Sequence, residues 1–371
     1  MPMINILHIT YDMRIGGTEQ VINNLISGAD KQNFSMSVLC IESPLGPFSE
    51  PLIQQGIQIH QLNRKPNFDF DLVIKIRKII KEHDIHIVHC HQYTPWVYGA
   101  LAAFKQAKVV FTEHGRFYPD SSSLKRKVVN PIMAKLTDSV TAISQATKNA
   151  LVTYEFLSKK TIKVIYNGIK PLQVEDKEVE ELRLKLDISE QTIVLGTVAR
   201  LDPIKNHPMM LKAFKAALNN HPKIKLIIIG DGEGRAEIES IISELKLQQN
   251  VILTGYIPSP KAYIALIDIY LLSSFSEGTS MTLLEAMSLA KPCIVTNVGG
   301  NPEVVIDNKT GLVCPSDDQY KFSDAMAKLI EEKELCSSMS YAAKQRFEDT
   351  FTTSSMVDKY QKLYKNLVGG Q

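Results

Sequence analysis

The stretch Ser276-Glu277-Gly278-Thr279-Ser280-Met281-Thr282-Leu283-Leu284-Glu285-Ala286-Met287 decides how the second half of the chain folds. An apolar run at 267–272 precedes it and predicts a buried strand. A helix is expected to begin at Thr279 or Ser280, where a hydroxyl can cap the first free amides. Gly278 lets the backbone approach a ligand closely. The stretch therefore predicts a loop and a helix N-terminus at the carboxyl end of a strand, a place that binds anions.

Two carboxylates flank this predicted anion site. Glu277 lies in the loop, and Glu285 lies about two turns along the helix. A carboxylate accepts hydrogen bonds from sugar or ribose hydroxyls, while the start of the helix takes phosphates. A ligand that carries both kinds of group, such as a nucleotide sugar, would account for this combination.

Apolar runs typical of buried strands alternate with helical patterns along the chain. In the first half, the strand patterns lie at 3–10, 34–41, 57–62, 85–90, 108–112, 139–143 and 163–166. The pattern restarts in the second half, with strands at 192–198, 224–229, 251–255, 267–272, 292–296 and 311–314. This alternation predicts an α/β protein with two doubly wound parallel sheets that face a cleft, with ligands at the carboxyl ends of the strands.

A turn at 167–169 and a charged helical segment at 175–185 place the domain boundary near residue 170. We expect one domain over residues 1–170 and a second over 171–350. The segment 351–371 follows every strand of the second sheet and has no sheet partner left there. We therefore predict that it forms a helix that crosses back to the first domain.

The composition is typical of a globular cytoplasmic protein. No stretch approaches the run of about 20 apolar residues that spans a bilayer. The first residues enter a strand pattern directly, without the pattern of a signal peptide. The five cysteines are scattered and form no CxxC pair, so we expect buried free thiols in a reducing compartment.

The formal net charge of +2 hides an uneven distribution. Residues 1–170 carry 20 basic and 13 acidic side chains, a balance of +7, and the remainder carries 22 and 27, a balance of −5. A basic first half fits an anionic membrane leaflet, and it fits ordinary solvated charge equally well. The basic and apolar segment 124–136 likewise fits a helix on a membrane or, since Pro131 interrupts it, a helix at the edge of the cleft. We predict no nucleic-acid partner.

Two cations follow the first strand of the second half. Arg200 and Lys205 lie in one loop before a helix, at the same end of the sheet as Glu277. A guanidinium and an ammonium there can clamp a pyrophosphate and stabilise its charge as it leaves. A single loop lysine is often only a solvated charge, but the pairing of two cations favours a functional role.

The next two strands also end in candidate ligand-binding residues. Gly230-Asp231-Gly232-Glu233-Gly234 is a glycine-rich turn that lacks the GxGxxG spacing, and Gly232 is expected to pack close beside the nucleotide. Tyr256 and Ile257 follow the strand at 251–255, where a ring or a backbone edge can meet the base. A tyrosine at this place is also typical of simple packing.

The first half offers three candidate features. Gly16 and Gly17 follow the first strand, so their amides can approach a phosphate, or they can simply make a tight turn. His114 follows a later strand and can hydrogen-bond a sugar hydroxyl or the reacting centre. His89 and His91 resemble metal ligands, but no partner cluster is evident, so we predict no zinc site.

Together these residues resemble the retaining glycosyltransferases of family 4, which have the GT-B fold of two Rossmann-like domains. The resemblance covers nearly the whole chain. It is strongest in the second half, in the ordered motifs Gly196-x3-Arg200-x4-Lys205-Asn206, Gly230-Asp231-Gly232, Glu277-x7-Glu285 and Gly299-Gly300-x-Pro302-Glu303. The first half matches more loosely, as expected of a domain that binds a variable acceptor while the second domain binds the nucleotide-sugar donor.

The resemblance implies a role for each matching residue. These roles are donor-sugar contact for Glu277, ribose contact for Glu285, diphosphate binding for Arg200 and Lys205, phosphate approach for Gly16 and Gly17, and a place beside the sugar for His114. Glu277, His114, Arg200 and Lys205 are thus the candidate catalytic residues. The nucleotide-binding set is completed by Gly232, Tyr256, Ile257, Gly278, Thr279 and Ser280.

The implied activity is transfer of a hexosyl group from a UDP- or GDP-linked sugar to a glycan or lipid-linked acceptor, with retention of configuration. The expected setting is bacterial surface polysaccharide synthesis, of O-antigen, capsule or exopolysaccharide. We expect no metal and no other cofactor, because Asp69-Phe70-Asp71 has the DxD spacing but precedes a helix. Two alternatives stay open: a nucleotide-sugar 2-epimerase of the same fold, and a non-catalytic nucleotide-binding scaffold.

Overall fold

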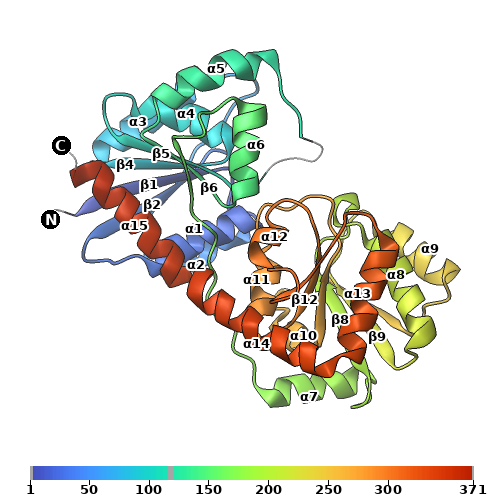
Figure 1. Ribbon diagram of the computed structural model, residues 1–371. Coiled ribbons are helices and arrows are strands. Elements are labelled where there is room, and N and C mark those ends of the chain that lie inside the picture. The colour runs from blue at the N-terminus through green and yellow to red at the C-terminus, as the bar shows by residue number, and fades with distance from the viewer. Residues whose placement is uncertain (1–2, 116–119, 370–371) are drawn as a thin grey trace. The chain divides into compact units, whose positions relative to one another are not determined.

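The computed structural model describes residues 3–115 and 120–369, and they divide into two compact units (Figure 1). Unit 1 holds the chain up to Gly168 together with the segment from Thr353 onward, and unit 2 runs from Ile169 to Thr352. The chain therefore passes between the units twice, at 168–169 and at 352–353. Each crossing lies two residues from the boundary expected from the sequence.

Unit 1 contains a parallel sheet of seven strands in the order β3-β2-β1-β4-β5-β6-β7. The strands are β1 (Ile4–Thr10), β2 (Phe34–Cys40), β3 (Ile59–Gln61), β4 (Ile87–His91), β5 (Lys108–Glu113), β6 (Ser139–Ala142) and β7 (Ile162–Val164). Its helices are α1 (Gly17–Gly28), α2 (Glu50–Gln54), α3 (Phe70–Glu82), α4 (Tyr93–Ala103), α5 (Leu124–Lys135), α6 (Gln145–Glu155) and α15 (Thr353–Gly369). The last helix, α15, belongs to this unit and packs against α1.

Unit 2 contains a parallel sheet of six strands in the order β10-β9-β8-β11-β12-β13. The strands are β8 (Ile193–Val198), β9 (Ile224–Ile229), β10 (Val251–Gly255), β11 (Ile269–Leu272), β12 (Cys293–Thr296) and β13 (Gly311–Cys314). Its helices are α7 (Asp176–Lys185), α8 (His207–Asn220), α9 (Arg235–Glu244), α10 (Lys261–Leu266), α11 (Met281–Ser288), α12 (Asn301–Val304), α13 (Gln319–Glu331) and α14 (Lys333–Thr350).

The strand order of each sheet identifies where a ligand can bind. In unit 1 the order reverses between β1 and β4, and in unit 2 it reverses between β8 and β11. At such a switch point the connections leave toward opposite faces of the sheet, which opens a crevice outside the carboxyl ends of the two strands. The loops after β8 and β11 carry Arg200, Lys205 and Glu277.

Packing on both faces of each sheet explains why the strands are mostly apolar. Helices cover both faces of each sheet, so both faces must bury apolar side chains. The strand β9 reads Ile-Lys-Leu-Ile-Ile-Ile, and its last four residues are buried. Burying each such side chain contributes about 1.5–3 kcal/mol to folding.

Every predicted strand is present, and its ends differ from the prediction by at most two residues. The helix α4 begins at Tyr93, with Pro95 in its first turn, where the missing N–H is tolerated. The short helical segments Pro47–Ser49 and Glu50–Gln54 were missed. They are too short to show a helical period, although each has a proline in its first turn.

Among the described helices, none is long and apolar enough to cross a membrane. The five cysteines are free thiols, and all except Cys336 are buried. Burial raises the pKa of these thiols, which favours the unreactive protonated form.

Candidate functional site

Three loops meet at the carboxyl ends of β8, β11 and β12, beside the switch point of unit 2. The loop after β11 is tied to the loop after β8, because the Ser273 hydroxyl donates to the Lys205 carbonyl oxygen (2.7 Å). The loop after β12 joins them where the Gly300 N–H donates to the Glu277 carbonyl oxygen (3.2 Å). Motifs far apart in the sequence thus form one platform around Lys205 and Glu277.

Gly299 is required by the way these loops approach each other. Its φ is +50°, in the left-handed region that favours glycine. A Cβ atom at this position would also overlap the carbonyl oxygen of Glu277. The Gly299-Gly300 pair therefore holds the backbone of the Glu277 loop in place.

We expect the substitution Gly299→Ala to displace the Glu277 loop and to lower the free energy of unfolding of unit 2 by more than about 2 kcal/mol. Gly56→Ala is the matched control, because Gly56 also has a positive φ (+76°) but open space around its Cβ position. It should cost only about 1 kcal/mol. Chemical denaturation of both variants measures the difference, and equal losses would mean that the close approach at Gly299 is unimportant.

Lys205 and Glu277 form a partly buried ion pair. The Lys205 Nζ lies 2.7 Å from Glu277 Oε1, and the two side chains are 19% and 8% exposed. The Ser274 hydroxyl donates to the same carboxylate oxygen (2.6 Å). The predicted phosphate-binding cation and the predicted sugar-binding carboxylate therefore orient each other before any ligand arrives. No role was assigned to Ser274 from the sequence.

Arg200 lies in the same loop as Lys205 but is exposed. Its guanidinium pairs with Asp202 at 3.0 Å. The glycine-rich turn holds this loop, because the Leu201 N–H donates to the Asp231 carbonyl oxygen (3.0 Å). A Cβ atom on Gly232 would come within 2.7 Å of the Leu201 carbonyl oxygen. Gly232 thus packs closely against the loop that carries Arg200.

The helix α11 begins where the sequence predicts a hydroxyl cap. The Ser280 hydroxyl accepts a hydrogen bond from the Leu283 N–H (3.3 Å), so Ser280 is the N-cap and Met281 is the first helical residue. Thr279 is also buried in this loop. The amides of the first turn of α11 follow Glu277 closely in the sequence and lie at the same edge of the sheet as the Lys205–Glu277 pair. This position suits the binding of an anion.

Glu285 is a half-buried residue whose carboxylate has unused hydrogen-bonding capacity. Its Oε2 atom is buried and has no hydrogen-bond partner in the described part of the chain. Burial raises the pKa of Glu285 to about 7. A buried acceptor without a hydrogen bond lowers the stability of the protein when no ligand is bound. A ligand hydroxyl that donates to Oε2 would remove this cost, as the predicted ribose contact requires.

The remaining predicted residue pair of unit 2 lies at the edge of its sheet. Tyr256 is exposed and Ile257 half-buried, directly after the edge strand β10. Gly255 adjoins the glycine-rich turn, because its carbonyl oxygen accepts from the Gly230 N–H (3.0 Å). The structure therefore brings the turn and the end of β10 together, two strands away from the Lys205–Glu277 pair.

In unit 1, the predicted residues lie at the carboxyl ends of β1 and β5. Gly16 is the N-cap of α1 and has no side-chain cap among the described residues, and Gly17 is the first residue of the helix. His114 follows β5 directly. Its Nε2 atom lies 2.8 Å from His91 Nδ1, and its Nδ1 atom is buried without a partner in the described ranges.

The prediction that His89 and His91 lack a partner cluster is wrong. One ring nitrogen from each of His8, His89 and His91 lies within 4.8 Å of the other two, and all three rings are buried. The cluster was missed because it depends on the register of β1 against β4, which brings His8 beside His89. Both nitrogens of His89 already have partners, Tyr364 Oη (2.7 Å) and Thr112 Oγ1 (2.7 Å). These contacts account for His89 as a hydrogen-bonding group of the core.

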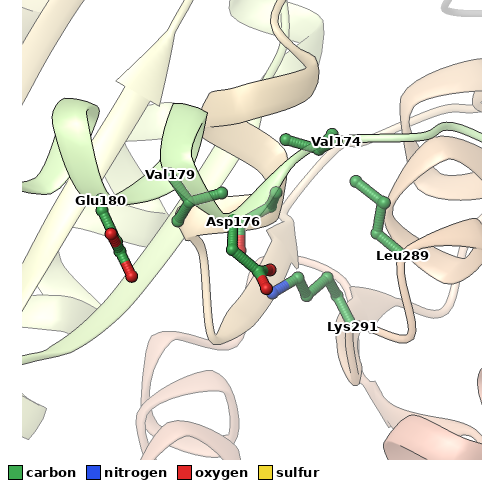
Figure 2. A pocket seen from close by; sticks show the side chains of 7 residues that line it. Val174, Asp176, Val179, Glu180, Leu289 and Lys291 are labelled. Carbon is green, nitrogen blue, oxygen red and sulfur yellow. The ribbon is translucent and has the colours of Figure 1, made fainter.

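A cavity of about 390 Å³ lies elsewhere in unit 2, lined by residues that include Asp176, Glu180 and Lys291 (Figure 2). Lys291 precedes β12, so the cavity is at the amino ends of the strands, opposite the loops described above. The Lys291 Nζ donates to the Ala265 carbonyl oxygen (2.6 Å), and burial lowers the pKa of Lys291. This cavity contains none of the residues singled out from the sequence.

Two family models match the sequence of the chain, one mainly in each unit. The model described as "Glycosyl transferases group 1" matches residues 178–346, within unit 2. The model described as "Glycosyltransferase Family 4" matches residues 15–171, almost all of them in unit 1. Together the two models cover most of the chain and both sets of loops.

Individual proteins with known sequences or structures are also similar. An Escherichia coli protein, UDP-Gal:alpha-D-GlcNAc-diphosphoundecaprenol alpha-1,3-galactosyltransferase, is 26% identical over 384 residues, which cover 98% of this chain and 97% of that one. An uncharacterised glycosyltransferase of Methanocaldococcus jannaschii is 30% identical over 286 residues, covering 72% and 71%. The solved structure of HepE from Anabaena in complex with UDP has a TM-score of 0.86 at 20% identity and covers 98% and 100%.

These likenesses settle both the fold and the class of protein. The two parallel α/β sheets have the GT-B arrangement of Rossmann-like domains that the resemblance implied. The relatives named above are glycosyltransferases, and none of their names supports the epimerase alternative. The chain belongs to the glycosyltransferases of family 4.

Proposed function

We propose that the protein transfers a hexosyl group from a UDP- or GDP-linked sugar to a glycan or lipid-linked acceptor during synthesis of a bacterial surface polysaccharide. The observation that carries this proposal is the platform of unit 2, where the Lys205–Glu277 pair stands beside a helix N-terminus and the unpartnered Oε2 of Glu285. The Escherichia coli relative is named for galactosyl transfer to a diphosphoundecaprenol-linked sugar, which supports a lipid-linked acceptor. The HepE structure holds UDP, which supports a nucleoside diphosphate.

The proposed reaction proceeds with retention of configuration. The bond between the anomeric carbon and the diphosphate oxygen breaks, and the acceptor hydroxyl oxygen forms its bond to the same face of the sugar. The acceptor proton passes to an oxygen of the departing phosphate. Arg200, Lys205 and the amides at the start of α11 stabilise the departing negative charge. Glu277 holds the sugar hydroxyls, and His114 is proposed to lie beside the sugar.

We propose that this chemistry needs no metal ion. The cations and amides described above supply the positive charge that a metal would otherwise provide. The Asp69-Phe70-Asp71 sequence serves another purpose, because Asp69 caps α3 by accepting from the Leu72 N–H (3.2 Å). Full transfer activity in the presence of EDTA would be the expected result, and activity restored only by added Mg²⁺ or Mn²⁺ would contradict it.

A panel of nucleoside diphosphates and their sugars identifies the donor by thermal shift, because a ligand of the folded state raises its stability. The donor that raises the melting temperature most is then prepared with a radiolabel in its sugar and incubated with glycan and lipid-linked acceptors. NMR of the product gives the anomeric configuration. We expect acceptor-dependent transfer with retention. Conversion of the donor into an epimer without acceptor would favour the epimerase, and no shift with any nucleotide would favour the scaffold.

We further propose that α5 places the protein on the inner face of an anionic membrane. Leu124, Val128 and Ile132 are spaced four residues apart on one face and are 85%, 65% and 57% exposed. The sequence of α5 contains no acidic residue, and Lys125, Lys127 and Lys135 are exposed around this face. Exposed apolar side chains flanked by lysines are the pattern of a helix that lies in the headgroup region. Pro131 lies within α5 without ending it.

The triple substitution Leu124→Ser, Val128→Ser and Ile132→Ser is expected to reduce binding to vesicles of phosphatidylglycerol and phosphatidylethanolamine by at least about tenfold, because each loses apolar burial in the headgroup region. Leu184→Ser with Tyr341→Ser is the matched control, since these side chains are similarly exposed but lie in unit 2. Vesicle sedimentation measures both. Equal binding by the two variants would contradict the membrane surface.

A further inference from the structure

The interior of unit 1 contains a row of histidines that the proposed reaction does not explain. His8 on β1 pairs in register with His89 on β4, and His91 lies two residues further along the same strand. Alternate residues of a strand face the same side, so these rings share one face of the sheet. His91 is in register with Thr112 on β5, and His114 follows two residues later. The strand geometry therefore lines up His8, His91 and His114.

The three rings are joined edge to edge by two contacts. His8 Nδ1 lies 3.0 Å from His91 Nε2, and His91 Nδ1 lies 2.8 Å from His114 Nε2. The planes of neighbouring rings differ by only 24° and 28°, as contacts between ring edges require. The two outer nitrogens, His8 Nε2 and His114 Nδ1, are buried and have no hydrogen-bond partner in the described ranges. The row thus contains two hydrogen bonds, and the ring nitrogen at each end has no hydrogen-bond partner among the described residues.

Each ring carries a single proton at neutral pH. Burial lowers the pKa of His8 and of His114 to about 3, and it lowers the pKa of His91 well below the ordinary value. A neutral imidazole has one N–H donor and one acceptor nitrogen. Each contact in the row therefore needs one ring to donate and its neighbour to accept.

This requirement leaves two arrangements. Either all three protons are on Nδ1, so that His8 donates to His91 and His91 donates to His114, or all three are on Nε2 and both bonds run the other way. Any mixture places two N–H groups or two lone pairs face to face inside the protein, where a buried polar group without its hydrogen bond is destabilising. In the first arrangement His114 Nδ1 is a donor, and in the second it is an acceptor.

We propose that His8 and His91 are positioning residues whose tautomers are coupled to that of His114, so that the three rings always share one tautomer. Whether His114 Nδ1 donates to a ligand hydroxyl or accepts from it then changes only when the protons of His8 and His91 move as well. The tautomer coupling stands on the geometry of unit 1 alone. Its effect on catalysis rests on the proposed place of His114 beside the donor sugar.

Nitrogen-15 NMR of protein labelled at histidine tests the coupling directly in the full chain at pH 7. The expected spectrum shows His8, His91 and His114 protonated at the same ring nitrogen, with scalar coupling across both N–H···N contacts. Two different tautomers among the three rings, or a doubly protonated ring, would overturn the proposal. This measurement needs neither a variant nor a ligand.

Three variants then separate coupling from loss of packing. His91→Leu removes the ring that joins His8 to His114, so the shares of the two tautomers at His8 and at His114 are expected to become unequal. His8→Leu leaves the contact between His91 and His114, and these two rings should still share one tautomer. Tyr364→Phe removes the hydroxyl that contacts His89 in the same buried layer, outside the row, and should leave the tautomers of the row unchanged. Different tautomers at His91 and His114 in His8→Leu, or equal shares at His8 and His114 in His91→Leu, would sink the proposal.

Kinetics with the donor identified by thermal shift tests the catalytic consequence. His91→Leu is expected to lower kcat about tenfold while KM for the donor changes less than about twofold, because the partner that orients His114 is lost and binding of the donor is not. Placed in a His114→Ala background, His91→Leu should have no further effect on kcat. Additive losses would refute the positioning role. If no nucleotide sugar binds at all, the proposed function fails, while the NMR result still decides the coupling.

Discussion

Glu277→Gln is expected to lower kcat by about 10²–10³-fold and to leave the Kd for the nucleoside diphosphate within about threefold. The substitution keeps the size of the side chain but removes the charge that pairs with Lys205 (2.7 Å) and accepts from Ser274 (2.6 Å). The sugar hydroxyls then lose their anionic acceptor at the stage where positive charge develops on the anomeric carbon. The nucleotide retains the amides of α11 and Arg200.

Glu285→Ala is the matched comparison, because it should affect binding rather than turnover. Loss of a hydrogen bond to a charged acceptor is worth about 1.5–3 kcal/mol, so the Kd for the nucleoside diphosphate should rise about 10- to 100-fold. The free protein should become more stable, since the variant removes a buried carboxylate whose Oε2 has no partner in the part of the chain that the structure describes. A residue that costs stability and contributes affinity is typical of a ligand site.

Calorimetric titration and steady-state kinetics distinguish the two roles. The account requires a fall in kcat for Glu277→Gln and a rise in Kd for Glu285→Ala. Two variants with equal, near-wild-type constants would refute the assignment of both carboxylates.

Acidification is expected to destabilise unit 1 far more than unit 2. Burial lowers the folded-state pKa of five histidines in unit 1: His8, His60, His89, His91 and His114. In the unfolded chain these rings take up protons below about pH 6.5. Since the unfolded state then binds more protons, stability falls as pH decreases from about 6.5 toward 4, by up to about 1.4 kcal/mol per pH unit for each ring. The raised pKa of Glu19 offsets at most one ring.

Unit 2 should respond weakly over the same range. Burial lowers the pKa of His207 to about 4, so the contribution of His207 to the free energy of unfolding of unit 2 falls as the pH decreases. Glu285 has its pKa raised to about 7, so its folded form binds the proton first, and stability rises as pH falls from about 7 to the unfolded value of about 4.3. The two contributions oppose each other.

The single tryptophan makes this difference measurable. Trp96 is buried in unit 1, so its fluorescence follows the unfolding of that unit, while circular dichroism follows both. Urea denaturation at pH 7, 6 and 5 should show the Trp96 midpoint falling steeply and a second transition that barely moves. A Trp96 midpoint independent of pH would mean that the histidine row is not kept neutral by burial.

The sequence was sufficient for the fold because its signals are local. Buried strands such as β9 and β13 begin and end where their apolar runs do, and Ser280 caps α11 as its hydroxyl predicts. The segment from Thr353 onward has no strand of unit 2 to cover and belongs to unit 1. Segments too short to show a period, such as α2, were missed.

The site was only partly predictable, because pairing between distant residues leaves no local pattern. Arg200, Lys205 and Glu277 were recognised by their position after strands, but the ion pair of Lys205 with Glu277 depends on two loops 72 residues apart. His8 was missed altogether, since only the register of β1 with β4 brings it beside His91. A histidine in the middle of an otherwise apolar strand was the one available signal.

Hydrogen–deuterium exchange with and without saturating UDP or GDP tests most directly whether the loops beside the Lys205–Glu277 pair bind the nucleotide. The account predicts protection of the segments 199–206, 273–285 and 297–301. It predicts unchanged exchange at 174–180 and 289–291, which line the cavity of Figure 2. Protection of that cavity without protection of the three loops, or no protection with either nucleotide, would contradict the account.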